Sequence, residues 1–285
     1  MDNTVGSIKR RARGAFSVNR STVLIALLII FGFNFVTSLI ASYIPLGGLT
    51  ALIELVFIFP VFMAGTTLFY LNIIDGKNAH YLDVFKGFKQ AWILFKTQLL
   101  ANWVPILWGL LFFIPTFIIA GVQTMQTFSW MWNPWELAWV FFPLLAGIAA
   151  MVISSYAYSM SIYLVNDHPG IGAREAVKAS KAMMKGQKMR FFRTQLSFIW
   201  WNLGALIVFF LLFLLMAAAP MLAIILLIFA ALGYLALQFF YLAPYFNLTL
   251  ASFYRTLIEE RNNLSEEAFT LVDEAGFSKV NLQKS

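Results

Sequence analysis

The sequence predicts an all-α, polytopic membrane protein: a bundle of six transmembrane helices with two amphipathic interfacial helices on the cytoplasmic side. Composition is the first observation, because the 285-residue chain is 61% hydrophobic and only 12% charged, whereas a soluble domain carries roughly 25% charged residues. The second is a set of apolar runs longer than the roughly 18 residues that mark a transmembrane helix. The third is the placement of basic residues in alternate loops. Together they exclude a soluble, a disordered and a fibrous protein.

Hydropathy divides the chain into a membrane domain, residues 22–254, and two flanking cytoplasmic segments. Residues 1–21 form a basic N-terminal segment, and residues 255–285 form a C-terminal tail. The six predicted spans are at about residues 22–43, 48–73, 97–121, 137–165, 194–217 and 221–243.

The basic residues define the predicted orientation. The 20 Lys and Arg fall as five in residues 1–20, four in 75–97, seven in 167–193 and four in 255–285. The opposite connections contain none: 44–47, 122–136 and 218–220. Short loops rich in Lys and Arg stay in the cytoplasm. We therefore expect a multi-pass plasma membrane protein with both termini cytoplasmic.

The two long inner loops resemble each other, and we call them the first elbow (residues 75–97) and the second elbow (residues 167–193). Each begins with an aspartate, Asp75 or Asp167, and continues through an amphipathic stretch. Each enters the next span through an aromatic, basic, Thr-Gln-Leu sequence, at 95–99 and 192–196. The separations differ by five residues, so the pattern indicates an imperfect internal repeat in parallel orientation.

Five basic residues of the second elbow recur at helical spacing and are predicted to share one helix face. They are Arg174, Lys178, Lys181, Lys185 and Lys188. Such a helix can lie on the inner membrane surface, where each basic residue gains about 1 kcal/mol from anionic phospholipid headgroups. A phosphorylated ligand or an acidic partner is the alternative. Nucleic acid is disfavoured as a partner, and we predict none, because no nucleic-acid motif accompanies the charge and the segment has its own apolar face to bury.

Glu54 is the acidic residue that falls inside a predicted span. A charge in hydrocarbon costs a few kcal/mol, so Glu54 should face protein, a cavity or the outer interface. Pro60 and Gly65 follow, and they indicate a kinked, closely packed helix. Glu54 is therefore a candidate ligand-site residue, with a structural hydrogen bond to a neighbouring span as the alternative.

Four further polar side chains in or beside the spans complete the candidate intramembrane site: Asn34, Gln238, Tyr156 and Tyr241. Their structural alternative is hydrogen bonding between helices, worth about 0.6 kcal/mol each where measured.

The chain lacks the constellations that carry catalysis. It has no cysteine, and its two histidines, His80 and His168, do not form a zinc motif. Asp75, Asp83 and Asp167 lie near them, but aspartates at span ends are typical helix caps. We therefore predict no catalytic residue, no metal site and no cofactor.

Several segments resemble the bacterial integral membrane family catalogued as domain of unknown function 975. The resemblance covers Ser155-Tyr156-Ala157-Tyr158-Ser159-Met160, Glu175-Ala176-Val177-Lys178-Ala179-Ser180, Met184-Lys185-Gly186, Leu196-Ser197-Phe198-Ile199-Trp200-Trp201, Ala243-Pro244-Tyr245-Phe246 and Ala251-Ser252-Phe253-Tyr254. It implies a six-helix bundle in the plasma membrane and implies no activity.

Two functions compete at this point. In the first, the protein is not an enzyme and binds or transports an amphiphilic or lipid-like molecule. In the second, it is a scaffold or regulatory subunit whose inner elbows and tail dock a membrane protein partner or a second copy of the chain. A cavity lined by the candidate residues would favour the first.

Overall fold

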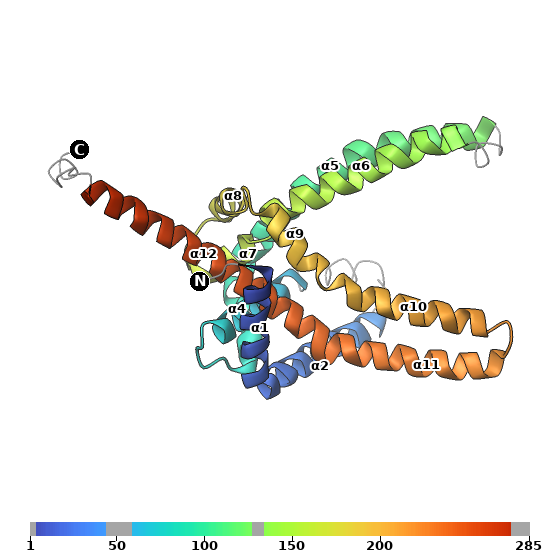
Figure 1. Cartoon of the computed structure of the whole chain (residues 1–285), viewed down its shortest axis with the longest axis horizontal. Helices are drawn as coiled ribbons and strands as arrows, with labels where there is room; N and C mark the ends of the chain where they lie inside the picture. Colours follow the sequence, from blue (N-terminus) through green and yellow to red (C-terminus); the bar gives the residue numbers. More distant parts are fainter. Residues whose placement is uncertain (1–3, 44–58, 127–133, 275–285) are drawn as a thin grey trace.

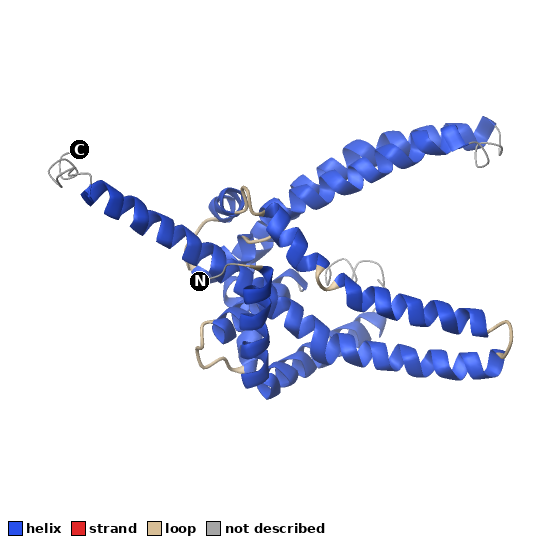
Figure 2. Cartoon of the chain, in the orientation of Figure 1, coloured by secondary structure: helices blue, strands red, loops and turns tan. Residues whose placement is uncertain are grey.

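The computed structural model describes residues 4–43, 59–126 and 134–274, and all its regular elements are helices (Figures 1 and 2). The strongly apolar helices are α2 (Arg20–Tyr43), α4 (Phe59–Ile74), α5 (Ala91–Gln126), α6 (Pro134–Tyr158), α10 (Ile199–Leu215) and α11 (Pro220–Leu237). The remaining elements are α1 (Val5–Val18), the 3₁₀ helix η2 (Tyr81–Gln90), α7 (Ser161–Asp167), α8 (Ala173–Met183), α9 (Lys188–Leu196), the π-helical turn η4 (Gln238–Leu242) and α12 (Ala243–Glu274).

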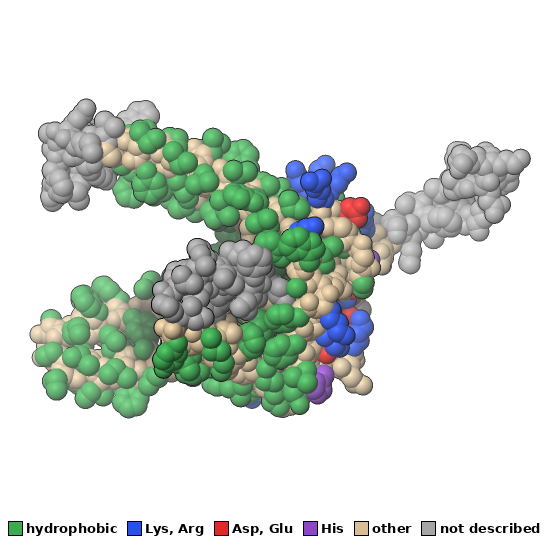
Figure 3. Space-filling model, turned by 180° about the vertical axis from the view of Figure 1, so that it is seen from behind, with side chains coloured by type: hydrophobic (Ala, Val, Ile, Leu, Met, Phe, Trp, Pro, Cys, Tyr) green, Lys and Arg blue, Asp and Glu red, His purple; other side chains and the backbone are tan. Residues whose placement is uncertain are grey.

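The helices form a central hub from which apolar arms project. The hub contains α1, α4, η2, α7, α8 and the first part of α12, while the α5–α6 pair and the α10–α11 pair extend from it as two arms (Figure 1). Hydrophobic side chains cover the arms, and Lys and Arg gather at the hub (Figure 3). Phe142, Trp200 and Phe229 on the arms are 72%, 72% and 69% exposed. A surface of this kind is stable in lipid and not in water.

Five helices of the described chain are long and apolar enough to cross a membrane. They are Arg20–Ile40, Tyr81–Gly121, Val140–Asp167, Lys188–Leu215 and Pro220–Asn263. Each contains most or all of one predicted span. The second predicted span, 48–73, overlaps the shorter apolar helix Phe62–Ile74, and its first part, 48–58, lies outside the described residues.

The hub is held together by α1 packing on α12. Ile8, Ala12 and Phe16 recur every four residues on α1, so they share one face, and all three are buried. Their partner α12 is also buried at Leu248 and Ser252, and the Ser252 hydroxyl donates to the Ile8 carbonyl at 3.3 Å. A short basic helix that would be unstable alone is therefore fixed by its apolar stripe.

Two glycines allow close approach of neighbouring backbones. A Cβ atom on Gly65 in α4 would lie 1.8 Å from the Val84 carbonyl oxygen of η2. On Gly147 in α6 it would lie 2.7 Å from the Phe112 Cβ of α5. The close packing predicted at Gly65 is present, and its partner is the first elbow.

The second elbow differs from the single helix that the spacing of its basic residues predicts. Helix α8 ends at Met183, Gly186 adopts a positive φ of 81°, and α9 begins at Lys188. Positive φ is readily reached by glycine and breaks a helix. Arg174, Lys178 and Lys181 therefore share α8, whereas Lys185 lies in the turn and Lys188 starts the next helix.

The apolar side of α8 packs on protein. Ala176, Ser180 and Met184 are fully buried, and α8 contacts α5, α6 and α7. The Ser180 hydroxyl donates to the Ala157 carbonyl at 3.0 Å and accepts from the Met160 N–H at 3.2 Å. This face is thus used inside the hub, where the sequence predicted contact with the membrane surface.

The first elbow keeps part of its apolar side exposed. Its residues form η2, in which Phe85 contacts the Phe62 ring of α4 with centroids 5.6 Å apart. Leu82, Phe88 and Trp92 remain exposed. The two elbows therefore bury their apolar residues to different extents.

Candidate functional site

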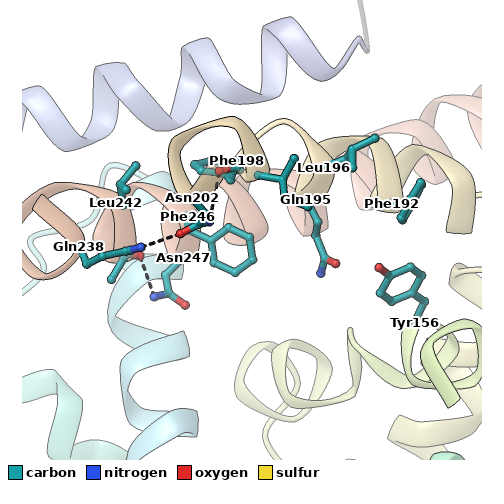
Figure 4. Close-up of a pocket in the computed structure, with 12 residues that line it drawn as sticks. Tyr156, Phe192, Gln195, Leu196, Phe198, Asn202, Gln238, Leu242, Phe246 and Asn247 are labelled. Carbon is teal, nitrogen blue, oxygen red and sulfur yellow. Dashed lines mark hydrogen bonds between the residues drawn. The ribbon is translucent and has the colours of Figure 1, made fainter. Parts of the chain in front are cut away.

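A groove lies at the hub end of the α10–α11 arm, between α6, the α9–α10 junction and the η4–α12 junction (Figure 4). Its volume is about 530 Å³. The lining is mostly apolar, with one tyrosine and four side-chain amides among it: Tyr156, Phe192, Gln195, Leu196, Phe198, Ile199, Asn202, Gln238, Leu242, Ala243, Phe246 and Asn247.

Asn202 is the centre of a hydrogen-bond network at one end of the groove. Its side-chain oxygen accepts from the Gln238 amide at 2.8 Å and from the Tyr234 hydroxyl at 2.6 Å. The Gln238 amide also lies 2.5 Å from the Tyr234 oxygen. This network joins α10 to α11 and η4, so it fixes the distance between α10 and α11 at the end of the arm where the groove begins.

Gln238 owes its position to a local change of helix type. Residues Gln238–Leu242 form a π-helical turn in which the Ala243 N–H donates to the Gln238 carbonyl. Pro244 follows and has no N–H to continue the ordinary α-helical ladder. Single π turns widen a helix and frequently occur at functional sites. Here the wide turn lies beside the groove.

Two polar groups in the groove have no partner within the described part of the chain. Gln195, from the Thr-Gln-Leu motif of α9, and Tyr156, at the end of α6, are half-buried, and neither side chain has a hydrogen bond to another described residue. Figure 4 draws both among the apolar side chains of the lining. Polar groups in an apolar setting gain most from a hydrogen-bonding partner.

A second hollow of about 430 Å³ continues along the arm between α10 and α11. Trp200, Trp201, Gly204 and Gly233 help to line it, and so does Tyr234. Because Tyr234 is bonded to Asn202 and Gln238, one polar network separates the groove from this apolar hollow. The pair of hollows offers polar contacts at the hub end and only apolar walls farther out.

The junction of α9 and α10 is held from the other side by α1. The Lys9 ammonium donates to the Ser197 hydroxyl at 3.0 Å and lies 4.5 Å from the centre of the Phe198 ring. Partial burial, and secondarily the charge of Arg13, lowers the pKa of Lys9. Phe198 also lines the groove, so α1 helps to fix one of its walls.

A charged cluster in the hub unites the two elbows. The Arg255 guanidinium of α12 donates to Asp75 at 2.6 and 2.7 Å and to Asp167 at 2.6 and 2.8 Å. The Tyr254 hydroxyl donates to Asp167 at 3.1 Å. Bidentate hydrogen bonds between arginine and a carboxylate are among the strongest hydrogen bonds in proteins. The aspartates that open the two elbows therefore bind one arginine.

The elbows share further local geometry. Each aspartate is followed by a turn with a glycine at positive φ, Gly76 at 67° or Gly170 at 104°. An acidic side chain then caps each new helix: Asp83 accepts from the His80 N–H at 3.3 Å, and Glu175 accepts from the Gly172 N–H at 3.1 Å. The spacing from aspartate to capping acid is eight residues in both elbows.

The threonines of the repeated Thr-Gln-Leu motif are also equivalent. Thr97 and Thr194 are fully buried, and each hydroxyl donates to the carbonyl four residues earlier. The extra five residues of the second elbow therefore fall between its capping acid and Thr194, a segment that contains the turn around Gly186. The local geometry supports the sequence repeat and locates its insertion.

The predicted intramembrane site residues do not all lie at one site in the structure. Tyr156 and Gln238 line the same groove. Tyr241 instead contacts the Phe16, Trp201 and Tyr245 rings, with centroids 5.8 to 6.4 Å apart. Asn34 donates to a carbonyl of its own helix, at Ile30.

Glu54 lies outside the described residues. Of the basic candidates, Arg174, Lys178, Lys181 and Lys185 are exposed, and Lys188 is half-buried. Among the residues that the structure describes, no group of three or more His, Asp or Glu is arranged to hold a metal ion. Asp83 and His80, three residues apart in the sequence, cap the N-terminus of η2.

Sequence reasoning missed Asn202 and Asn247 as site residues, and it included Gln195 only within the repeated Thr-Gln-Leu motif. Their signal was the concentration of amides at the hub ends of the last two spans. Arg255 was counted within the tail. Its signal was a basic residue directly after residues 251–254, in a chain where the span-end aspartates Asp75 and Asp167 were interpreted only as helix caps.

The chain was compared with known families, curated proteins and solved structures. The model of the family described as "Protein of unknown function (DUF975)" matches residues 1–261. No curated protein and no solved structure matches the chain. The family match includes the hub, both arms and the groove. The chain therefore belongs to the protein family of unknown function DUF975.

Proposed function

We propose that this protein is a non-enzymatic integral membrane protein that binds an amphiphilic, lipid-like molecule in the groove between α6, α9–α10 and η4–α12. The observation that carries the proposal is the pair of unpartnered polar groups, Gln195 and Tyr156, in a mostly apolar groove. An amphiphile supplies hydrogen bonds for these groups and an apolar tail for the hollow beyond Tyr234.

The energetics favour an amphiphile over a purely polar or purely apolar ligand. A polar group in an apolar setting without a partner costs about 1–3 kcal/mol on the scale of protein substitutions. An apolar ligand leaves that cost in place, and a small polar ligand leaves the aromatic and aliphatic walls unfilled. Binding is also the first step of transport, so one experiment bears on both roles.

The orientation that we propose puts the hub in the cytoplasm and the arms in the plasma membrane, with both termini cytoplasmic. The gathering of Lys and Arg at the hub supports it, because basic segments remain inside. The exposed basic residues of α8 then face anionic headgroups, and each gains about 1 kcal/mol.

The test is retention of lipid through purification. Full-length protein is purified in a mild detergent, and the bound lipids are quantified by native mass spectrometry. We expect Gln195→Leu and Tyr156→Phe each to lower occupancy about fivefold, because one ligand hydrogen bond is lost.

The matched control is Gln98→Leu, at the equivalent position of the first elbow, outside the groove. It should retain the wild-type amount of lipid. Equal retention by the wild type and both groove variants would remove the proposal. Equal losses in Gln98→Leu would assign the effect to general damage near the elbows.

A scaffold or regulatory subunit is the second candidate function. It is favoured by α12, which continues past the hub and projects away from the other helices (Figure 1). A photoreactive amino acid at exposed Arg261 should then cross-link a membrane protein or a second copy of the chain. The same group at exposed Ser17 on α1 is the control. Cross-links of equal yield at both positions would count against docking through α12.

A further inference from the structure

A different hollow lies on the hub between the start of α5 and the start of α8. Its volume is about 500 Å³, and its lining comes from Lys96, Leu99 and Leu100 on α5 and from residues 172–175 around the start of α8. It shares no residue with the groove of the proposed function. We call it the α5–α8 notch.

The notch holds two cationic side chains without acidic partners. Lys96 and Arg174 are both exposed, and neither forms an ion pair with another residue in the described ranges. The Lys96 ammonium lies 4.6 Å from the centre of the Trp92 ring, which keeps it beside α5. Two such cations from different helices attract a phosphate group.

The acidic residue of the notch is already engaged. The Glu175 carboxylate accepts the Gly172 N–H at 3.1 Å and caps α8. The helix terminus is therefore occupied by the chain itself, and anion binding in the notch depends on Lys96 and Arg174. With one acid and two bases among its lining residues, the notch keeps a net positive charge.

The apolar wall of the notch continues into the membrane arm. Leu99 is 43% exposed, and exposed Trp103, Ile106 and Leu110 follow it at three- and four-residue steps along α5. Residues at this spacing share one side of a helix. A ligand anchored at Lys96 can therefore lay an acyl chain along α5.

We propose that the α5–α8 notch binds one molecule of an anionic phospholipid. Lys96 and Arg174 hold the headgroup phosphate, and an acyl chain runs along the Leu99 side of α5. This site is distinct from the diffuse attraction of the α8 basic residues, because it joins charge and an apolar wall in one hollow. The lipid bridges the α5–α6 arm to the second elbow.

The test is a lipid titration of the full-length protein in detergent, followed by native mass spectrometry. Phosphatidylglycerol and phosphatidylcholine with the same acyl chains are the probes. We expect the first phosphatidylglycerol to bind about tenfold more tightly than phosphatidylcholine. The Lys96→Gln, Arg174→Gln double variant should lose this preference.

The matched control is Lys178→Gln, Lys181→Gln, which removes the same charge from the exposed side of α8 outside the notch. It should keep the preference. An equal loss in this control would overturn the proposal in favour of diffuse surface attraction. An unchanged preference in the notch variant would overturn it as well.

Two further measurements separate the sources of the phosphate. Glycerol phosphate, added at the lipid concentration, should not displace phosphatidylglycerol. Displacement would overturn the proposal that the ligand is a lipid and would indicate a soluble phosphate instead. Leu99→Asn should weaken phosphatidylglycerol binding severalfold with an unchanged unfolding temperature. An unchanged affinity of the Leu99→Asn variant for phosphatidylglycerol would contradict the proposed contact between the acyl chain and α5. The Gln195 and Tyr156 variants test the other groove, so the two proposals fail separately.

Discussion

Arg255 and Asp167 are joined by hydrogen bonds of 2.6 and 2.8 Å although 88 residues separate them in the chain. The same guanidinium binds Asp75, 180 residues away. One side chain of α12 therefore ties together the first and the second elbow. The hub can form only when α4, α7 and α12 have come together.

The first prediction concerns this cluster. Arg255→Gln should lower the free energy of unfolding by about 3 kcal/mol, because removing one partner leaves two carboxylates facing each other in a largely buried site. Thermal unfolding of the purified protein in detergent measures the loss. Arg11→Gln breaks a more exposed pair with Glu259, with side chains 38% and 46% exposed, and should cost less than about 1 kcal/mol.

Equal costs for the Arg255 and Arg11 variants would contradict the central role of the cluster. Asp75→Asn combined with Arg255→Gln should cost less than the sum of the two single changes, since both remove the same contacts.

The second prediction concerns Ser180, whose hydroxyl links α8 to the break between α6 and α7. Ser180→Ala leaves the Ala157 carbonyl and the Met160 N–H without their side-chain partner. We expect a loss of about 2 kcal/mol in unfolding free energy. Ser17→Ala is the control, because the Ser17 hydroxyl is exposed and bonds within its own helix. A loss no larger than that of the control would refute the assignment.

The third prediction concerns Gly65. Gly65→Ala should prevent α4 from packing on η2, because the new methyl group would overlap the Val84 backbone carbonyl. Folded yield from detergent extracts, measured by size-exclusion chromatography, should fall sharply. Gly14→Ala in α1 is matched, since its Cβ meets nothing within 4 Å, and it should stabilise the helix by up to about 1 kcal/mol. A normal yield of Gly65→Ala would argue against this packing.

The fourth prediction concerns the polar network of the arm. Asn202→Leu removes the shared acceptor of Tyr234 and Gln238, and it should cost about 1 kcal/mol, because two contacts worth about 0.6 kcal/mol each are lost. Chemical unfolding in mixed micelles measures this. Tyr234→Phe should add little in the Asn202→Leu background, and full additivity of the two changes would disprove the network.

The long apolar helices were the predictable part of the fold. Hydropathy reports how long an apolar run is, and the runs at 22–43, 97–121, 137–165, 194–217 and 221–243 all lie largely within helices of spanning length. The hub was less predictable, because its contacts join distant segments. Nothing in the local sequence around Arg255 specifies Asp75 and Asp167 as its partners.

The second elbow illustrates a further limit. The sequence pattern predicted an amphipathic helix in this elbow, and in the structure Ala176, Ser180 and Met184 are buried. The same pattern serves an interface with lipid or with protein, so it did not distinguish the two. The spacing of the basic residues predicted that Lys185 and Lys188 share one helix face with Arg174, but α8 ends at Met183 and Gly186 adopts a positive φ in the turn before α9.

The candidate site was partly predictable for a related reason. Gln238 and Tyr156 stood out as polar residues in apolar surroundings, and the fold brings both to one groove. Tyr241 and Asn34 stood out equally, and they satisfy local structural contacts instead. The rotation of each helix about its axis decides which polar residues contact each other, and hydropathy gives no information about that rotation.

The wide turn at Gln238–Leu242 has a consequence for the whole molecule, because α12 inherits its angular setting from it. Each residue of an ordinary helix advances the chain by about 100°. A π turn holds one residue more than an α turn, so tightening it to an α turn without removing a residue would rotate every downstream side chain about the helix axis by about that angle. Arg255 would then face away from both aspartates. The π turn beside the groove therefore determines whether Arg255 can form its ion pairs with Asp75 and Asp167.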